Sequence, residues 1–296
     1  MRQCTGASSG AVSRIVASVV DSAAVAGASE TAYIVFDTES VVDGHLVGRV
    51  LYPGERLAPR EAVQRLEEEL RADGGGDNPF LPVTFQVPVA VGVARVGRDY
   101  RLLDIAALDA PRFQPRKLVE LFWKGVQVYS EAALVNFNGR GFDIPLLTLS
   151  AFRFGVSCKR YFDDPDRFGF RYRFSPKHID LMEWITEYGA FRLRGGLNLL
   201  AKMLGKPGKM DTRGDQVAAL HAEGKLQEIN DYCLYDVLDT YFVFLRTRVL
   251  ASRITLGQEQ DLVAETREWL AQRAKTLPVL EKYLEGFGVW SPEPFQ

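Results

Sequence analysis

The sequence predicts an α/β protein in which helices flank a mixed β-sheet and a helical extension follows at the C-terminal end of the chain. Strand-like apolar segments come first, and helical and strand-like segments then alternate, as in sheets covered by helices. Acidic residues follow the apolar segments, at the strand ends where ligands of such sheets bind. The 296 residues, of which 47% are hydrophobic, suffice for the core of one large domain.

Residues 1–30 are rich in Ala, Ser, Val and Gly and precede the first strand pattern, which begins at Thr31. Arg2 and Arg14 come before the first acid at Asp21, a composition shared with transit peptides. A flexible extension or a wrongly assigned start is the alternative interpretation. These residues are therefore left out of the predicted fold.

The first structural elements are predicted between residues 31 and 105. The run from Ala32 to Phe36 is continuously apolar and β-rich, which predicts a buried central strand with site residues at its end. Residues 60–71 have helical spacing and stop at a loop rich in Gly and Asp, so we interpret residues 53–82 as an insertion. Residues 86–96 and 99–105 predict a hairpin.

The rest of the predicted domain, residues 31–250, alternates helices with a strand. A helix over 116–130 leads into a second apolar strand at 133–136, and more helices are expected at about 145–153, 181–188, 196–204 and 224–249. The C-terminal extension, residues 251–296, contains a long, charged helical pattern from 257 to 284. This extension is expected to pack on the domain or to meet a partner.

Charge and cysteine content exclude several classes of protein. The 36 basic residues are offset by 38 acidic ones, so the net charge of −2 gives no global attraction to nucleic acid, and a polyanion has to be held locally. The cysteines Cys4, Cys158 and Cys233 are widely spaced and odd in number, which favours neither a disulfide framework nor a zinc site. A reducing cytoplasm fits best. No apolar run reaches the roughly 18 residues of a membrane span.

Asp37 and Glu39 form the first candidate metal site. They stand at positions i and i+2 directly after an apolar strand, so in extended backbone both point to one face. Two carboxylates at one sheet end suit a hard cation. Such a pair also occurs at solvated strand ends, so it does not decide the function alone.

Two more acids lie near elements that are expected to pack beside this strand. Asp143 follows a strand and a turn with two glycines and stands near a helix start, where it faces Asp37 or acts as an N-terminal cap. Tyr232 and Asp236 are spaced i to i+4, which places them on one helix face. Asp239 falls one turn later, where a solvated helix face explains it.

These three pieces, in this order and spacing, resemble the DEDD exonuclease superfamily and its RNase H-like fold. The matching residues are Asp37 with Glu39, Asn138 to Phe142-Asp143, and Tyr232 with Asp236. The chain resembles the tyrosine branch of this superfamily, because Tyr232 stands four residues before the last acid, Asp236. The histidine branch has a histidine five residues before that acid, where this chain has Asp231.

Three further phrases resemble predicted exonucleases related to the proofreading domain of family B DNA polymerases. They are His178-Ile179-Asp180-Leu181-Met182, Lys206-Pro207-Gly208-Lys209 and Tyr232-Cys233. The resemblance spans residues 33–245 and leaves out the insertion and the tail.

The resemblance implies a 3′-5′ exonuclease that acts on single-stranded nucleic acid, DNA above all, and releases nucleoside 5′-monophosphates. Two Mg²⁺ or Mn²⁺ ions are implied, with Asp37 bridging both, Glu39 and Asp236 completing one site and Asp143 supporting the other. Tyr232 is implied to orient the attacking water, because an unperturbed phenol is a poor base.

Contacts to the substrate are expected in two places. Asn138 either hydrogen-bonds near the terminal nucleotide, beside Phe142, or shapes the turn before Gly139. In residues 168–174, aromatic rings on even positions alternate with arginines, which predicts a strand with one aromatic and one arginine face. Phe170 and Tyr172 then stack on bases while Arg171 meets phosphate, or the rings cover a core.

Three polar residues outside the expected site are predicted to have structural roles or to lie in solvent. His178 is expected at a strand start, Asp180 as a helix cap before Leu181, and Lys209 as a solvated loop lysine unless its loop reaches the cleft. Two other functions remain open: a non-catalytic nucleic-acid-binding module of a polymerase or repair complex, and a 3′-5′ exoribonuclease, since the motifs contain no identifiable reader of the sugar.

Overall fold

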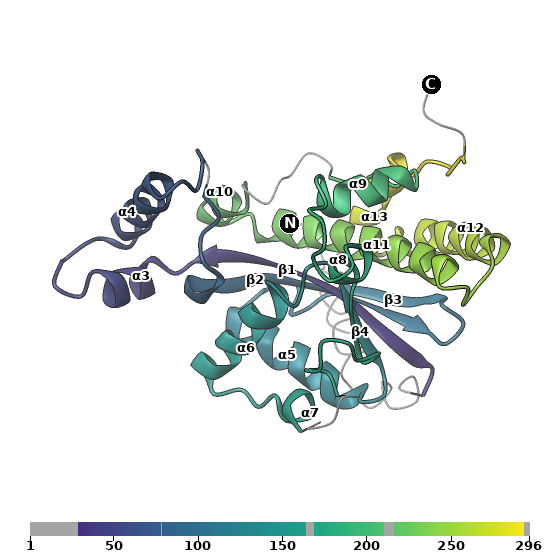
Figure 1. Ribbon diagram of the computed structural model, residues 1–296, viewed down its shortest axis with the longest axis horizontal. Coiled ribbons are helices and arrows are strands. Elements are labelled where there is room, and N and C mark those ends of the chain that lie inside the picture. The colour runs from purple at the N-terminus through teal and green to yellow at the C-terminus, as the bar shows by residue number, and fades with distance from the viewer. Residues whose placement is uncertain (1–28, 78, 164–168, 210–215, 293–296) are drawn as a thin grey trace, which may run out of the picture.

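The computed structural model describes residues 29–77, 79–163, 169–209 and 216–292 (Figure 1). The predictions for residues 1–28 and for Phe168 lie outside this part of the chain. Within it, the expected mixed sheet flanked by helices is confirmed.

One mixed sheet of five strands forms the centre of the described chain, in the order β3-β2-β1-β4-β5. β1 pairs antiparallel with β2 and parallel with β4, and β5 continues the parallel part. The hairpin expected after residue 86 is formed by β2 and β3. The strands are β1 (Thr31–Val42), β2 (Gln86–Gly97), β3 (Leu102–Ala107), β4 (Ala133–Asn136) and β5 (His178–Asp180).

Helices cover both faces of this sheet (Figure 1). One face carries α5 (Pro115–Val128) and α6 (Asp143–Phe154), with α7 (Lys159–Phe162) beside them. The other face carries the long helix α11 (Leu226–Leu250), with α9 and α10 near it. The remaining helices are α3 (Gly44–Leu51), α4 (Pro59–Ala72), the short 3₁₀ helix η1 (Val83–Phe85), α8 (Leu181–Ile185), α9 (Gly196–Met203), α10 (Val217–Ala222), α12 (Leu256–Arg273) and α13 (Val279–Glu285).

The side chains of β1 alternate between these two helical layers. Ile34 and Phe36 belong to the core beneath α5 and α6, whereas Val35 belongs to the core beneath α11. Because strand side chains alternate, Asp37 and Glu39 continue the Val35 face and Thr38 continues the Phe36 face. This alternation sends the two acids towards α11 and Thr38 towards α6.

β1 is longer than the apolar run predicted. It continues past Phe36 to Val42, because β2 pairs with it as far as Gln86. The pairing with β4 stops at Val35, so in the described part of the chain no strand adjoins Asp37–Glu39 on the side of β4. The β1–β2 register shifts directly after Glu39, the kind of irregularity that re-aims a strand beside a functional site. The acids therefore lie within the strand, not at its end.

The interpretation of residues 168–174 as a strand is wrong. Residues 169–174 form turns, and the side chain of Arg140 holds them by donating to the backbone oxygens of Phe170 (3.4 Å), Tyr172 (3.2 Å) and His178 (3.1 Å). A period of two specifies a strand only where another strand is available for pairing. Beyond β4 the sheet adds only the short β5 in the described chain.

Residues 43–85 connect β1 to β2 through α3 and α4. These two helices pack on each other around a small core of Val47, Tyr52, Ala62 and Leu66. Asp43 caps α3 by accepting from the backbone N–H of Leu46 (3.1 Å). In Figure 1 this segment projects beyond one end of the sheet.

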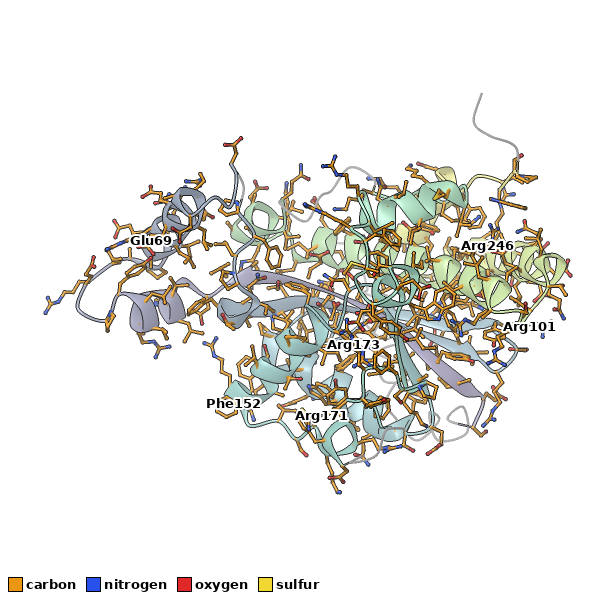
Figure 2. All side chains as sticks on the ribbon, in the orientation of Figure 1. Glu69, Arg101, Phe152, Arg171, Arg173 and Arg246 are labelled. Atoms are coloured by element: carbon orange, nitrogen blue, oxygen red, sulfur yellow. The ribbon has the colours of Figure 1, made fainter. Side chains whose placement is uncertain are left out.

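The C-terminal extension packs on the domain as two helices, α12 and α13. Leu262 and Leu270 of α12 and Leu280 and Tyr283 of α13 share a core with α11 and the sheet. Glu259, buried in α12, forms an ion pair with Arg246 of α11, with Nε and Oε1 2.8 Å apart (Figure 2). In the described residues, no helix is long and apolar enough to cross a membrane.

Candidate active site

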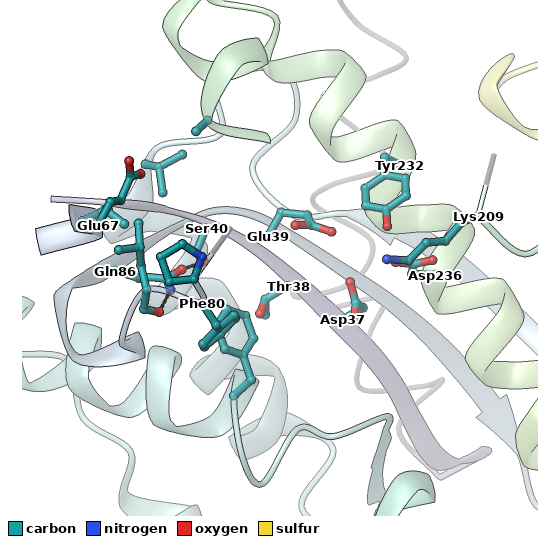
Figure 3. A pocket seen from close by; sticks show the side chains of 16 residues that line it. Asp37, Thr38, Glu39, Ser40, Glu67, Phe80, Gln86, Lys209, Tyr232 and Asp236 are labelled. Carbon is teal, nitrogen blue, oxygen red and sulfur yellow. Dashed lines mark hydrogen bonds between the residues drawn. The ribbon is translucent and has the colours of Figure 1, made fainter. Parts of the chain in front are cut away.

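Three carboxylates converge between β1 and α11. Oxygen atoms of Asp37, Glu39 and Asp236 all lie within 4.8 Å of one another (Figure 3). Asp37 and Glu39 reach this point from the α11-facing side of β1, and Asp236 reaches it from the helix. The structure thus brings together three of the four carboxylates that the sequence analysis expected at one site, from positions 37, 39 and 236.

The electrostatics of this group fit a divalent cation. Burial raises the pKa of Asp37 and of Glu39 well above the ordinary range, and the neighbouring carboxylates raise both further. Burial also raises the pKa of Asp236 to about 6, against the effects of Tyr232 and Lys209, which lower it. Crowded acids that offer only oxygen atoms suit a hard ion that neutralises them, such as Mg²⁺ or Mn²⁺.

Asp143 lies at the start of α6 and is held beside β1 by Thr38. The Thr38 hydroxyl donates to Oδ1 of Asp143 over 2.6 Å, and the Thr38 backbone also bonds this carboxylate. Burial raises the pKa of Asp143 to about 7, and the charge of Asp143 in turn raises the pKa of Asp37. Helix α6 begins at Asp143 itself, and Phe142 is its N-cap residue. The side chain of Asp143 therefore does not act as the N-terminal cap of this helix.

Tyr232 stands beside the acids on the same face of α11 as Asp236. Its hydroxyl donates to the Asp236 carboxylate, and burial, followed by the charges of Asp236 and Glu39, raises the pKa of the phenol. The phenol therefore keeps its proton at neutral pH. Tyr235 turns away and donates to the backbone oxygen of Val279 in α13 over 3.3 Å.

Cys233 fixes the distance between α11 and the strands, a role that sequence reasoning missed. Its thiol donates to the backbone oxygen of Asp37 (3.3 Å) and lies 3.6 Å from the Asp37 carboxylate. The backbone N–H of Gly92 in β2 points to the same sulfur over 3.2 Å. A Cβ at Gly92 would come within 2.9 Å of Val237, so only glycine lets the helix approach this closely.

A cavity of about 590 Å³ opens beside the carboxylates and is lined by Tyr232, Phe142 and residues 79–81 among others. Lys209 also lines it, and its charge lowers the pKa of both Glu39 and Asp236. The backbone N–H of Lys209 donates to Oδ1 of Asn198 in α9 over 2.8 Å, which anchors the loop here. Lys209 is exposed, and its side chain faces the site (Figure 3), so the condition that its loop reaches the cleft is met.

The loop from Asn138 to Phe142 is shaped by its glycines and by Asp180. Asn138 has a left-handed backbone, with φ of 63°, and a Cβ at Gly139 would overlap the Asn136 amide at 1.5 Å. Asp180 accepts from the backbone N–H groups of Asn138 (3.0 Å) and Arg140 (2.9 Å). It also caps α8, as expected.

Of the proposed substrate contacts, only some are accessible. Phe142 lines the cavity, and Asn138, four positions earlier in the chain, is exposed. Phe170 is fully buried against Tyr161 in the core beneath α5, so its interpretation as a base-stacking ring is wrong. Tyr172 is exposed, and the Arg171 guanidinium lies over the ring of Phe162 at 4.8 Å. Neither lines the cavity.

Asp239 was expected on a solvated helix face and is instead fully buried. It accepts a hydrogen bond of 2.7 Å from the hydroxyl of Tyr283 in α13, and burial raises its pKa to about 7. His178 is the first residue of β5, as expected, with Nε2 3.2 Å from Oδ1 of Asn136. Both are structural residues outside the carboxylate group.

Comparison with protein families gives a match over most of the chain. Residues 78–287 match a family described as predicted 3′-5′ exonucleases related to the exonuclease domain of PolB. The matched region runs from the loop before β2 through α13 and contains Asp143, Lys209, Tyr232 and Asp236. It leaves β1, with Asp37 and Glu39, outside. A search of curated proteins found no match.

Proposed function

Since the chain belongs to the family of predicted 3′-5′ exonucleases related to the exonuclease domain of PolB, we propose that it removes nucleotides one at a time from the 3′ end of single-stranded nucleic acid. One observation carries this proposal. Asp37 and Glu39, which lie outside the matched residues, meet Asp236 within 4.8 Å, with the Tyr232 hydroxyl bonded to Asp236. β1 thus supplies the acids that the matched region lacks.

Two divalent cations, Mg²⁺ or Mn²⁺, are the proposed cofactors. Asp37, Glu39 and Asp236 would hold one, and Asp37 with Asp143 would hold the second, directly or through water. Such ions, when bound, stabilise the attacking and leaving oxygens and acidify the attacking water. The raised pKa values of Asp37 and Glu39 support this assignment, because the acids ionise fully only when positive charge is supplied.

Tyr232 is proposed to orient the water that attacks the phosphorus atom. Its raised pKa keeps the phenol protonated, so it acts as a hydrogen-bonding group and not as the base. Lys209, which lines the same cavity, is proposed to contact the phosphate or to stabilise its charge. Water attack on phosphorus would break its bond to the 3′ oxygen of the penultimate nucleotide, which would release a nucleoside 5′-monophosphate and leave a 3′-hydroxyl on the strand.

DNA is the preferred substrate in this proposal, and an exoribonuclease is the alternative, because the carboxylates act on phosphate in both polymers. Asn138, Arg171 and Tyr172 remain proposed contacts to the strand outside the cavity. A non-catalytic binding module of a polymerase or repair complex is less favoured, since the acids and the phenol of a nuclease are assembled together. Cys158 and Cys233 are free thiols, which supports a reducing cytoplasm.

The decisive experiment incubates the protein with 5′-labelled single-stranded DNA, single-stranded RNA and a primer with a mismatched end, each with Mg²⁺ or Mn²⁺. We expect a ladder that shortens from the 3′ end, faster on DNA, and none with EDTA. Asp37→Ala, purified identically, controls for a contaminating nuclease. Intact substrates under all conditions with wild-type protein would contradict the proposal, and faster shortening of RNA would favour the exoribonuclease.

A further inference from the structure

A second cavity lies between α12 and the segment that follows α13, on the side of the sheet that α11 covers (Figure 1). Its volume is about 390 Å³, within the roughly 300–1,000 Å³ of small-molecule sites. One wall is α12, and the facing wall is formed by residues 287–290. None of the described residues that line it also lines the cavity beside Asp37, so a ligand here would leave the catalytic cavity free.

The wall formed by α12 is mainly apolar and carries one long cation. Val263, Ala264 and Ala271 line it at helical spacing, and Arg267 lies on the same side of the helix. Among the described residues Arg267 forms no ion pair, so its guanidinium is open to an anion. Glu268, an acid that also lines the cavity, is exposed, so water screens its charge.

The side chain of Lys206 brings a buried cation to the same cavity. Only 3% of this residue is exposed. Its ammonium lies 3.9 Å from the ring centroid of Phe287 and 5.0 Å from that of Phe242. It donates to the backbone oxygen of Gly288 over 3.4 Å, and in the described chain no ion pair engages its other N–H groups. A buried cation without an acid in contact is costly unless an anion binds it.

The groups around Lys206 leave its charge uncompensated. Burial lowers the pKa of Lys206 to about 8, so the amine is mostly protonated at pH 7. The charges of Glu259 and Asp239 act against this shift, but both acids already bind other groups. The charges of Arg246 and Arg267 lower the pKa further. An anion from solvent would therefore find two cations without acidic partners in contact.

Aromatic rings complete the wall that faces α12. Phe287 and Trp290 are half-buried and line the cavity. The guanidinium of Arg267 lies 5.9 Å from the ring centroid of Phe287, and that of Arg246 lies 4.4 Å from the centroid of Trp290. Cations next to rings match a ligand that has both an anionic group and a planar apolar part. A mononucleotide has both, a phosphate and a base with a π-face.

One short loop reaches both this cavity and the catalytic one. Gly205 accepts a hydrogen bond of 2.7 Å from the backbone N–H of Gly288, which holds the loop against the C-terminal segment. Lys206 follows at the second cavity, and Lys209 lines the catalytic cavity. The three residues from Lys206 to Lys209 span at most ~11 Å of backbone. The second cavity is therefore close to the place where the proposed reaction would release its product.

We propose that this second cavity is a non-catalytic binding site for a nucleoside 5′-monophosphate, a choice of ligand that rests on the proposed exonuclease function. Lys206 and Arg267 bind the phosphate, and the base lies against Phe287 and Trp290. A phosphate monoester carries about −1.5 to −2 charges at pH 7, against one for a phosphate within a strand. Two cations therefore favour the released product over the intact strand.

Isothermal titration calorimetry in EDTA at pH 7 tests the site with adenosine 5′-monophosphate, adenosine and inorganic phosphate. Without metal, the acids of the catalytic cavity repel phosphate, so the titration reports on the second cavity. The monophosphate should bind with 1:1 stoichiometry, and adenosine and phosphate should each bind at least about tenfold more weakly. Equal affinity for phosphate and the monophosphate would overturn the base contact, and equal affinity for adenosine would overturn the phosphate contact.

Two variants locate the bound monophosphate. Lys206→Met keeps the apolar stem and removes the charge, so affinity should fall roughly 10- to 150-fold, the range for one lost hydrogen bond to a charged group. Arg267→Ala should cause a similar loss, and since Arg267 is exposed, its Tm should stay unchanged. Arg253→Ala is the matched control, because Arg253 is exposed and does not line the cavity. Wild-type affinity in both Lys206→Met and Arg267→Ala would overturn the site.

The outcomes separate this site from the proposed function. A protein that degrades DNA but binds no monophosphate in EDTA would overturn the second site and leave the exonuclease. A protein that hydrolyses no nucleic acid but loses the monophosphate through Arg267→Ala would support the site and contradict the proposed function. Loss of binding in Lys209→Ala alone would place the ligand in the catalytic cavity and overturn the second site.

Discussion

The hydroxyl of Thr38 donates to the carboxylate of Asp143 across 2.6 Å, and so joins β1 to the first turn of α6 between residues 105 positions apart. Because Thr38 stands between Asp37 and Glu39, one tripeptide contributes two of the acids and positions a third. This bond also lowers the pKa of Asp143, which burial raises to about 7.

Thr38→Val keeps the shape of the side chain and removes the hydroxyl. We expect activity or metal affinity to fall roughly 10- to 100-fold, the usual effect of losing a group that orients a metal ligand. The acid limb of the pH–activity profile should move to higher pH, because the pKa of Asp143 rises further without the bond. Thr38→Ser should restore both, and an unchanged profile for Thr38→Val would show that Thr38 does not position Asp143.

Asp37→Ala removes the acid whose pKa is raised by the charges of three other carboxylates, those of Asp143, Asp236 and Glu39. Turnover should fall by a factor of roughly 10³ or more if Asp37 holds metal during hydrolysis. The metal-free Tm should stay level or rise, because one of several repelling charges has gone. Nuclease assays and thermal melts on the same preparation measure both. Near-normal hydrolysis by the variant would remove Asp37 from the proposed mechanism.

The stability of the metal-free protein should fall as pH rises. Asp143, with a pKa of about 7, and Asp236, with a pKa of about 6, bind protons in the native state that the unfolded chain releases near its ordinary pKa of 3.8. Their stabilising contribution is therefore complete below about pH 4 and is lost by about pH 7. Thermal melts in EDTA should show this slope.

Divalent cations should reverse that slope. Mn²⁺ binds ionised carboxylates and competes with protons, so it should raise Tm more at pH 8 than at pH 5. A shift of Tm that is equal at the two pH values would mean that the ions bind elsewhere. Ca²⁺ and Mn²⁺ compared at equal concentration would separate metal binding from turnover.

Tyr232→Phe keeps the ring and deletes the hydroxyl that bonds Asp236. The turnover number should fall while KM changes little, because the hydroxyl orients water and not substrate. Tyr235→Phe loses its bond to Val279 instead and should change Tm slightly and turnover hardly at all. A rise in KM alone for Tyr232→Phe would assign the phenol to substrate binding.

Phe170→Ala and Tyr172→Ala separate the core from the surface of the 169–174 turn. Phe170 is fully buried, so its loss should cost ~3–5 kcal/mol of folding free energy and leave DNA affinity per folded molecule unchanged. Tyr172 is exposed, so Tyr172→Ala should leave Tm unchanged and weaken DNA binding only if a base stacks there. Denaturant melts and fluorescence anisotropy provide the two measurements. Stable Phe170→Ala protein would contradict the packing described here.

The sequence was sufficient where function depends on local spacing. Asp37 and Glu39 share a face because strand side chains alternate, and Tyr232 and Asp236 share one because helical neighbours are four apart. The sequence was insufficient where the contact partner of a residue lies far away in the chain. Asp239 is buried because Tyr283, 44 positions later, donates to it, and nothing near Asp239 indicates that bond.

The same limit explains the turn at residues 169–174. Alternating rings and arginines satisfied a strand pattern, but two backbone oxygens of that segment bond to the side chain of Arg140, 30 and 32 positions away in the chain. The place of Lys209 also depends on a residue that is not its neighbour in sequence. The amide oxygen of Asn198 in α9 accepts a hydrogen bond from the backbone N–H of Lys209 and so holds the loop at the site.

The packing of α12 and α13 on α11 has a consequence for cooperativity. The leucines of these helices and Tyr283 share one apolar core with Val237 and Leu238 of α11 and with Val35 of β1. If α12 and α13 left the domain, water would reach the apolar side of α11, the helix that contributes Asp236. We expect such an arrangement to unfold as a unit, with a single calorimetric transition for the residues before and after this turn. A cut in the turn after Leu250 would therefore impair the carboxylate group, although no described residue beyond that turn lines the cavity beside it.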